Sequence, residues 1–178
     1  MRPAVDPKRL GFTLIELLVV IAIISILSVA GFVNYRNFSA DQVTNKAAGD
    51  VKSILRLAQS NSTSSTACGA LIGGVSWAVI FNSDALSIGL VCGPANSLQR
   101  TYTLDNAQIQ IKGSSCATSS TLPITVTYPA GVGSLTFGSS DPCLVSSPTL
   151  SITVSNTRDT TASPKSFKIS KGGAIDVQ

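Results

Sequence analysis

The chain has 178 residues, a length that accommodates one modest folded domain and one additional segment. Only 12% of the residues are charged and the formal net charge is +4, far below the basic field of a typical nucleic-acid-binding domain. The chain has no His, so it lacks the commonest general base and the commonest metal ligand. This composition argues against an enzyme and against a metal site, and we expect no cofactor.

The first eleven residues form a short, basic and polar segment ahead of the most hydrophobic part of the chain. They include Arg2, Lys8 and Arg9 and end at Gly11. A secretory signal peptide instead places its apolar region before a small-residue cleavage site. Here the small residue, Gly11, comes first, so cleavage after it removes residues 1–11 and retains the apolar segment. Lys8 and Arg9 are expected to hold this leader on the cytoplasmic side of a membrane.

An uncharged apolar run extends from Leu17 to Val33, directly after residues 12–16. As a helix, residues 14–33 are about 30 Å long, which is enough to span a bilayer. Glu16 is the only Glu of the chain and belongs to this hydrophobic segment, residues 12–33. An ionisable side chain in such a segment is costly and therefore indicates a functional site. The alternative is an ordinary signal anchor with an incidental Glu.

The residues around Gly11 carry a specific motif. Gly-Phe-Thr-Leu-Ile-Glu at residues 11–16, followed by Leu-Leu-Val-Val-Ile-Ala-Ile, resembles the prepilin cleavage and methylation motif of type IV pilins and of the pseudopilins of type II secretion. In that family a membrane aspartyl peptidase cuts after the Gly and N-methylates the new terminal Phe. The resemblance implies that Gly11 is the cleavage residue, Phe12 the methylated residue and Glu16 the assembly residue.

The resemblance also implies partners and a location. The partners are other pilin or pseudopilin subunits in a filament, prepilin peptidase, the inner-membrane assembly platform and membrane lipid. The chain is expected in the bacterial inner membrane as a single-pass protein with its head outside the cytoplasm, and then in a pilus or pseudopilus. The assembly role agrees with electrostatics, because a buried carboxylate needs a cationic partner. In a helical stack, the Phe12 amine of one subunit can meet Glu16 of its neighbour.

Beyond Val33 the pattern becomes amphipathic. Apolar residues recur at three- to five-residue spacing, with charged residues between them. This spacing predicts one helix from about residue 12 to about residue 60, whose second half, residues 34–60, lies against a globular domain. The apolar positions of this half are Tyr35, Phe38, Val43, Ala47, Val51, Ile54, Leu55 and Ala58.

Residues 61–178 are predicted to form a β-rich globular head that begins with a loop at residues 61–66. Short runs rich in β-branched and aromatic residues alternate there with turn signals such as Gly-Gly and Gly-Pro. The expected fold class is therefore α+β, a long pilin-like hydrophobic helix packed on an antiparallel β-sheet head, with Trp77 in its core. The predicted strands are 70–72, 77–81, 86–91, 101–104, 109–111, 124–128, 150–154 and 167–169.

Four cysteines lie in the head, at Cys68, Cys92, Cys116 and Cys143, and no CxxC spacing typical of zinc sites occurs. An even number behind a membrane-targeting segment indicates two disulfides in an oxidising compartment. The alternative is four free, buried thiols. Three connectivities are possible, and we predict Cys68–Cys92 and Cys116–Cys143 because each closes a loop of about 25 residues between sequence neighbours.

The layout of the head is similar to the GspH/FimT group of minor pseudopilins and minor pilins. The similarity rests on residues 51–60 before the Trp77 strand, on Tyr-Pro-Ala-Gly at residues 128–131, and on the closing segment 167–177. Some members of that group bind DNA through arginines near the carboxyl terminus. The corresponding tail here has no arginine, and Lys165, Lys168 and Lys171 are the local basic residues. These three lysines form either a DNA-binding site or an ordinary solvent-exposed face.

Three functions follow from these observations. The leading one is a structural subunit of a type IV pilus or a type II secretion pseudopilus, major or minor. The second is a minor pilin that binds DNA during uptake. The third is an enzyme, but the chain has no nucleophile elbow, no phosphate-binding loop and no pair of acids at a catalytic spacing.

Overall fold

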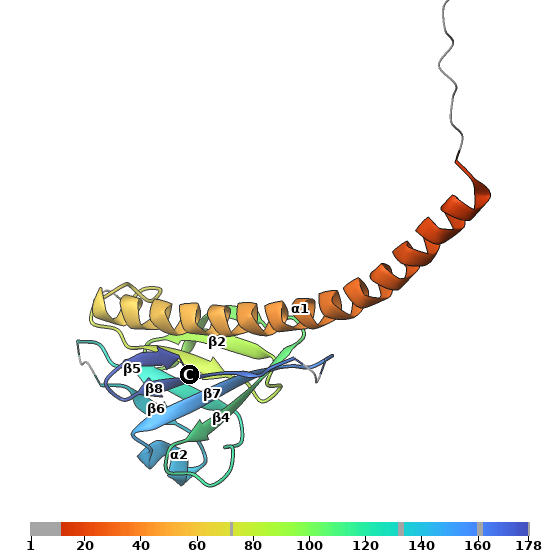
Figure 1. Cartoon of the computed structure of the whole chain (residues 1–178). Helices are drawn as coiled ribbons and strands as arrows, with labels where there is room; N and C mark the ends of the chain where they lie inside the picture. Colours follow the sequence, from red (N-terminus) through yellow and green to blue (C-terminus); the bar gives the residue numbers. More distant parts are fainter. Residues whose placement is uncertain (1–11, 72, 132–133, 160–161, 178) are drawn as a thin grey trace, which may run out of the picture. The chain divides into compact units, whose positions relative to one another are not determined.

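The computed structural model describes residues 12–71, 73–131, 134–159 and 162–177 (Figure 1), with the side chains of residues 29–34, 36, 37 and 177 left out. The predicted leader, residues 1–11, lies outside the described residues. The chain divides into two compact units, Met1–Phe38 and Ser39–Gln178, and each is described by itself.

The longest element is helix α1, Leu14–Thr63, which contributes to both units. It matches the predicted helix but continues through residues 61–63, where a loop was predicted. Hydroxyl groups explain the extension. Thr63 Oγ1 donates to the carbonyl of Gln59 at 3.1 Å, and Ser64 Oγ donates to that of Ser60 at 2.7 Å. These bonds satisfy carbonyls that have no backbone partner at a helix end.

The described part of the amino-terminal unit belongs mainly to the first half of α1. Tyr35 and Phe38, the predicted apolar positions that fall in this unit, are 69% and 62% exposed. Burial along α1 begins at Ala40, in the other unit. Among the described residues, no helix is both long and apolar enough to cross a membrane. The predicted span includes residues 29–33, whose side chains lie outside the description.

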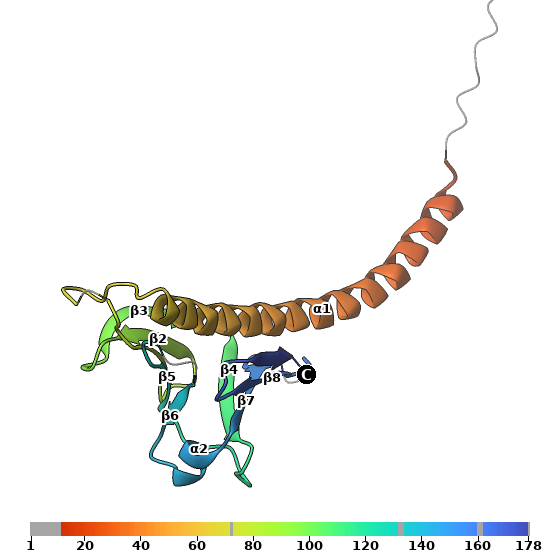
Figure 2. The ribbon, with the colours of Figure 1, turned by 90° about the vertical axis from the view of Figure 1, so that its left-hand side faces the viewer.

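The carboxyl-terminal unit contains two antiparallel sheets, with strand orders β3-β2-β1-β5-β6 and β4-β7-β8-β9. Both lie beneath the part of α1 that belongs to this unit (Figure 2), and the short helix α2, Pro142–Ser146, lies at their far end. The strands are β1 Trp77–Phe81, β2 Ser87–Cys92, β3 Ser97–Thr103, β4 Ala107–Gly113, β5 Ile124–Tyr128, β6 Thr136–Gly138, β7 Thr149–Asn156, β8 Lys165–Ser170 and β9 Ile175–Val177.

This arrangement confirms the predicted α+β class. One predicted strand, residues 70–72, is wrong, because Leu71 forms only an isolated bridge with Cys68 and residue 72 lies outside the description. Gly73 and Gly74 follow with φ values of +73° and +59°, a conformation that turns the chain out of an extended path. The prediction also missed β6, β9 and α2, which are too short to show a hydrophobic period.

The core of the head forms where α1 packs over both sheets. Val51, Ile54 and Leu55 of α1 are at most 2% exposed, and their three- and four-residue spacing places them on one helix face. Burial alternates along the whole of β7, so every second residue points inward. Trp77 is also buried, as predicted. Each large apolar side chain buried in this way stabilises the fold by about 1.5–3 kcal/mol.

Two buried polar side chains join α1 to the sheets. Ser62, near the end of the helix, donates its hydroxyl to the carbonyl of Tyr128 at 3.0 Å. Asn156, at the end of β7, donates its side-chain amide to the carbonyl of Ala40 at 3.3 Å. One bond lies at each end of the buried helix segment, so together they set its position along both sheets.

The hydroxyl of Tyr128 supports a prediction about stability. It is buried and has no hydrogen-bond partner among the described residues, and this desolvation raises its pKa well above the usual value. Tyr128→Phe keeps the ring and removes the unpaired hydroxyl. We expect the free energy of unfolding to stay unchanged or to rise by up to about 1 kcal/mol, measured by chemical denaturation. A clear decrease would show that the hydroxyl is hydrogen-bonded in solution.

The structure contains the disulfides Cys68–Cys92 and Cys116–Cys143, the same pairing as expected from the sequence. We expect replacement of both cysteines of either pair by Ser to lower the free energy of unfolding by about 3 kcal/mol, because each closed loop restricts the unfolded chain. Peptide mapping without reduction checks the pairing. Four thiols that can be alkylated in the native protein would contradict it.

Candidate processing and assembly site

The residues predicted for processing and assembly lie around the start of α1. Gly11, the predicted cleavage residue, lies outside the described residues. Phe12 and Thr13 precede the first helical residue, Leu14, and Phe12 is 82% exposed. The side chain of the predicted methylated residue is thus not packed against the described part of the chain.

Thr13 determines where the helix begins. Its Oγ1 accepts the backbone N–H of Glu16 at 3.3 Å, and its carbonyl accepts the N–H of Leu17 at 3.2 Å. This is the arrangement of an N-cap, and Thr-x-x-Glu is the sequence of a capping box. The role of Thr13 was not predicted, although this four-residue signal is visible in the sequence. The cap keeps Phe12 outside the helix, next to the bond that the peptidase is predicted to cut.

The carboxylate of Glu16, the predicted assembly residue, has no partner among the described residues. Its side chain is exposed, and no hydrogen bond or ion pair joins that carboxylate to any residue the structure describes. Glu16 lies in the first turn of α1, where the helix dipole stabilises a negative charge.

Apolar side chains surround the helix at and after Glu16. We call the described ones the apolar belt, and each is between 46% and 82% exposed. A helix that is apolar on all sides is normally buried in protein or membrane. Within its own unit the belt is thus an exposed apolar surface. Its members are Leu14, Ile15, Leu17, Leu18, Val19, Val20, Ile21, Ile23, Ile24, Ile26 and Leu27.

The polar side chains within this segment do not oppose its burial. Ser25 and Ser28 donate their hydroxyls to the carbonyls of Ile21 and Ile24, both at 2.7 Å. Their hydrogen-bonding capacity is thus satisfied inside the helix, which lowers the cost of placing them in apolar surroundings. Glu16 is then the group whose burial most requires a partner.

The cysteines do not form a metal site. Cys116, Cys143 and Asp141 lie close enough together to resemble a ligand set. However, both sulfur atoms belong to one disulfide, and a metal ligand would have to be a thiolate. Asp141 has another role, since its Oδ1 accepts the N–H of Cys143 at 3.0 Å and caps α2. This donor set fits a structural cross-link and does not fit a metal.

The three lysines considered for DNA binding differ in their contacts and in the direction of their side chains. Lys171 donates to the carbonyl of Val145 at 3.0 Å, and its Nζ lies 5.7 Å from the centroid of the Phe137 ring. Lys165 and Lys168 both belong to β8 but are three residues apart, so their side chains point to opposite faces of the sheet. The structure therefore gives these lysines three different surroundings.

Comparison with known proteins identifies the amino-terminal segment. Residues 6–32 match the family described as the prokaryotic N-terminal methylation motif. The matched residues include Gly11, Phe12, Thr13 and Glu16. Neither a curated protein nor a solved structure matches the chain. The amino-terminal motif predicted from the sequence is thereby confirmed.

Proposed function

We propose, from the prepilin-type signal that this chain shares with type IV pilins and pseudopilins, that it is a structural subunit of a type IV pilus or a type II secretion pseudopilus. Prepilin peptidase cuts after Gly11 and methylates Phe12, and the mature chain joins other subunits through its first helix. The observation that carries the proposal is the carboxylate of Glu16, which has no partner among the described residues and lies beside the exposed apolar belt. In this role the chain has no catalytic task.

The apolar belt can hold the chain in a membrane or a filament, but it does not fix the axial position of one subunit relative to the next. In the membrane the belt is covered by lipid, and in the filament by the belts of neighbouring subunits. Lipid tails and leucine side chains are similarly apolar, so this exchange gives little driving force and no preferred axial register. A directional polar contact is needed to set the register.

Glu16 and the Phe12 amine supply that contact. The N-methylated amine of one subunit meets the carboxylate of its neighbour. At a separation of about 4 Å and an effective dielectric constant of about 20, the pair gains about 4 kcal/mol before the cost of desolvation is subtracted. A neighbour placed in another register leaves both charges buried without partners, which is strongly unfavourable. The pair therefore selects one register.

The proposed surroundings follow from this assembly. The partners are other pilin-type subunits, prepilin peptidase, membrane lipid and the inner-membrane assembly platform. The head lies outside the cytoplasm, an oxidising space that suits its two disulfides. DNA is not included, because Lys171 is engaged with Val145 and Lys165 and Lys168 point to opposite faces.

Fractionation of the host tests this function. Filaments are sheared from cells and probed for the chain, alongside membranes and cytosol. We expect the mature chain in the filament and membrane fractions, and only the precursor, in membranes, in a strain without prepilin peptidase. Its abundance relative to the other filament proteins distinguishes a major from a minor subunit. A chain found only in the cytosol would contradict the proposal.

A further inference from the structure

A pocket on the second sheet of the head contains many hydrogen-bond donors and no acid. Its volume is about 310 Å³, which lies within the range of small-ligand sites. It is formed by the end of β4, the loop that follows, and the outer faces of β7 and β8. The lining residues are Lys112, Gly113, Ser114, Cys116, Thr149, Ser151 and Lys168.

The register of the sheet places the two lysines on either side of a serine. Ser151 of β7 pairs with Lys112 of β4 on one side and with Lys168 of β8 on the other. Residues paired in this way point to the same face, and the alternating burial of β7 shows that Ser151 points outward. Neighbouring strands lie about 4.8 Å apart, so the two lysine Cα atoms are about 10 Å apart. Both side chains are long enough to reach an ion held above Ser151.

These donors are not used within the described part of the chain. No hydrogen bond or ion pair joins the two ammonium groups or the three hydroxyls to a described residue. Two other lysines of the head are engaged, since Lys171 donates to the carbonyl of Val145 and Lys52 lies 5.1 Å from the centroid of the Phe167 ring, whereas Lys46 and Lys165 have no partner among the described residues. The unused groups are those of Lys112, Lys168, Ser114, Thr149 and Ser151.

The floor of the pocket is held in place before any ligand arrives. Gly113 is buried so closely against Ser147 that a Cβ atom there would clash with it. The backbone N–H of Ser115 donates to Ser147 Oγ at 3.2 Å, and Cys116 is fixed by its disulfide. The loop that carries Ser114 is therefore ordered by covalent and polar contacts, and binding does not have to order it.

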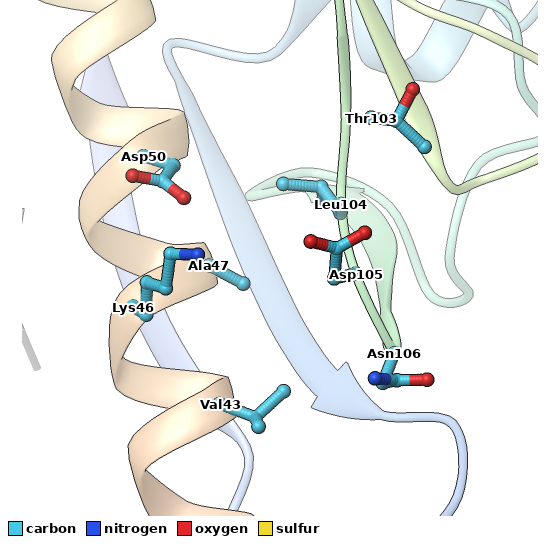
Figure 3. A pocket seen from close by; sticks show the side chains of 8 residues that line it. All are labelled: Val43, Lys46, Ala47, Asp50, Thr103, Leu104, Asp105 and Asn106. Atoms are coloured by element: carbon cyan, nitrogen blue, oxygen red, sulfur yellow. The ribbon is translucent and has the colours of Figure 1, made fainter.

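A second pocket provides a comparison within the same head. It has a volume of about 100 Å³ and lies between α1 and the turn after β3 (Figure 3). It contains one lysine, Lys46, together with two acids, Asp50 and Asp105. The two carboxylates give this pocket a negative balance. In the first pocket the nearest acid in the register is Asp176, which pairs with Lys168 from β9 and is not part of the lining.

We propose that the pocket around Ser151 binds a tetrahedral oxyanion, phosphate or sulfate, either free or carried on a sugar. Lys112 and Lys168 supply charge-assisted hydrogen bonds, and the three hydroxyls supply neutral ones. The five groups carry up to nine N–H and O–H donors, because each ammonium has three, and this number exceeds the roughly four acceptor positions of a carboxylate. The volume leaves room beside the ion for the sugar.

Binding of inorganic phosphate to the full chain in a non-ionic detergent tests this inference. Equilibrium dialysis at low salt is expected to give one phosphate per chain. Lys112→Gln and Lys168→Gln are each expected to weaken binding by about fivefold or more, because each removes a charged donor. Ser151→Ala is expected to weaken it without changing the net charge. Lys46→Gln is the matched control, since it removes the same charge from the acidic pocket, and binding should be unchanged.

Sulfate and glucose 6-phosphate are then compared with phosphate. If glucose 6-phosphate binds more tightly than phosphate, the ligand is a phosphorylated sugar. If the two affinities are equal, the ligand is the free ion. Both results support the site. Circular dichroism and thermal melting establish that each variant is folded. The inference is overturned if phosphate does not bind at concentrations up to about 10 mM. Binding weaker than this corresponds to a binding free energy of less than about 3 kcal/mol in magnitude. The inference is also overturned if Lys46→Gln weakens binding as much as Lys112→Gln.

Discussion

Glu16→Ala is expected to abolish incorporation of the chain into filaments while leaving its head folded and its leader cleaved. The substitution leaves the Phe12 amine of the neighbouring subunit buried without a partner. Removal of one member of a buried ion pair typically costs about 3–5 kcal/mol, which weakens each subunit contact by more than about a hundredfold. Every contact of this kind in the filament is affected, so the loss should be nearly complete.

The start of the helix should survive this change. Thr13 caps α1 through the backbone N–H of Glu16, and that N–H remains in every Glu16 variant except Pro. Glu16→Gln keeps the size of the side chain and removes only the charge, so it should fail to assemble as Glu16→Ala does. Asp50→Ala, which removes an exposed acid of α1 within the head, is the matched control and should assemble normally.

Recovery of sheared filaments, with membrane levels measured alongside, is the assay for Glu16. Equal membrane levels of mutant and wild type are expected, so that a loss from filaments reports on assembly. Normal incorporation of Glu16→Ala would show that Glu16 does not set the register. Loss of the variant from the membrane would instead assign Glu16 a role in stability.

Gly11→Leu is expected to leave almost all of the chain as an uncut precursor in the membrane, absent from filaments. A bulky residue replaces the small one that the peptidase requires at the bond before Phe12. Without cleavage no Phe12 amine forms, so Glu16 of the neighbour has no cation to meet. The two substitutions thus remove opposite members of the same pair and should give the same assembly defect.

Apparent size on immunoblots separates the two defects. Gly11→Leu should run as the longer precursor and Glu16→Ala as the mature chain. Gly11→Ala keeps a small residue and should be cut far more efficiently than Gly11→Leu. A mature-length product from Gly11→Leu would contradict the assignment of the cleavage site.

Long periodic elements were predictable from the sequence, and short ones were not. Helix α1 has a sustained apolar spacing, and its buried positions Val51, Ile54 and Leu55 follow it. Helix α2 has five residues, so its only local signal is Asp141 before Pro142, an N-cap followed by a favoured first helical residue. Strands β6 and β9 have three residues each and depend on pairing with β5 and β8.

The processing site and the pocket around Ser151 also differ in how far the sequence alone predicts them. The residues predicted for processing and assembly, Gly11, Phe12 and Glu16, lie close together in sequence, so the motif alone predicts them, and the residues matched at 6–32 include all three. The pocket around Ser151, which we propose binds an oxyanion, combines Lys112, Ser151 and Lys168, which are far apart in the chain. Only the register of β4, β7 and β8 brings them together, and no sequence period encodes that register.

Intact-mass and amino-terminal peptide mass spectrometry of the chain purified from its host tests whether the chain is processed as a prepilin-type subunit. We expect a mature protein that begins at an N-methylated Phe12, retains the apolar belt and contains two disulfides. A protein that still begins at Met1, or one whose new terminus lies beyond the belt, would contradict it.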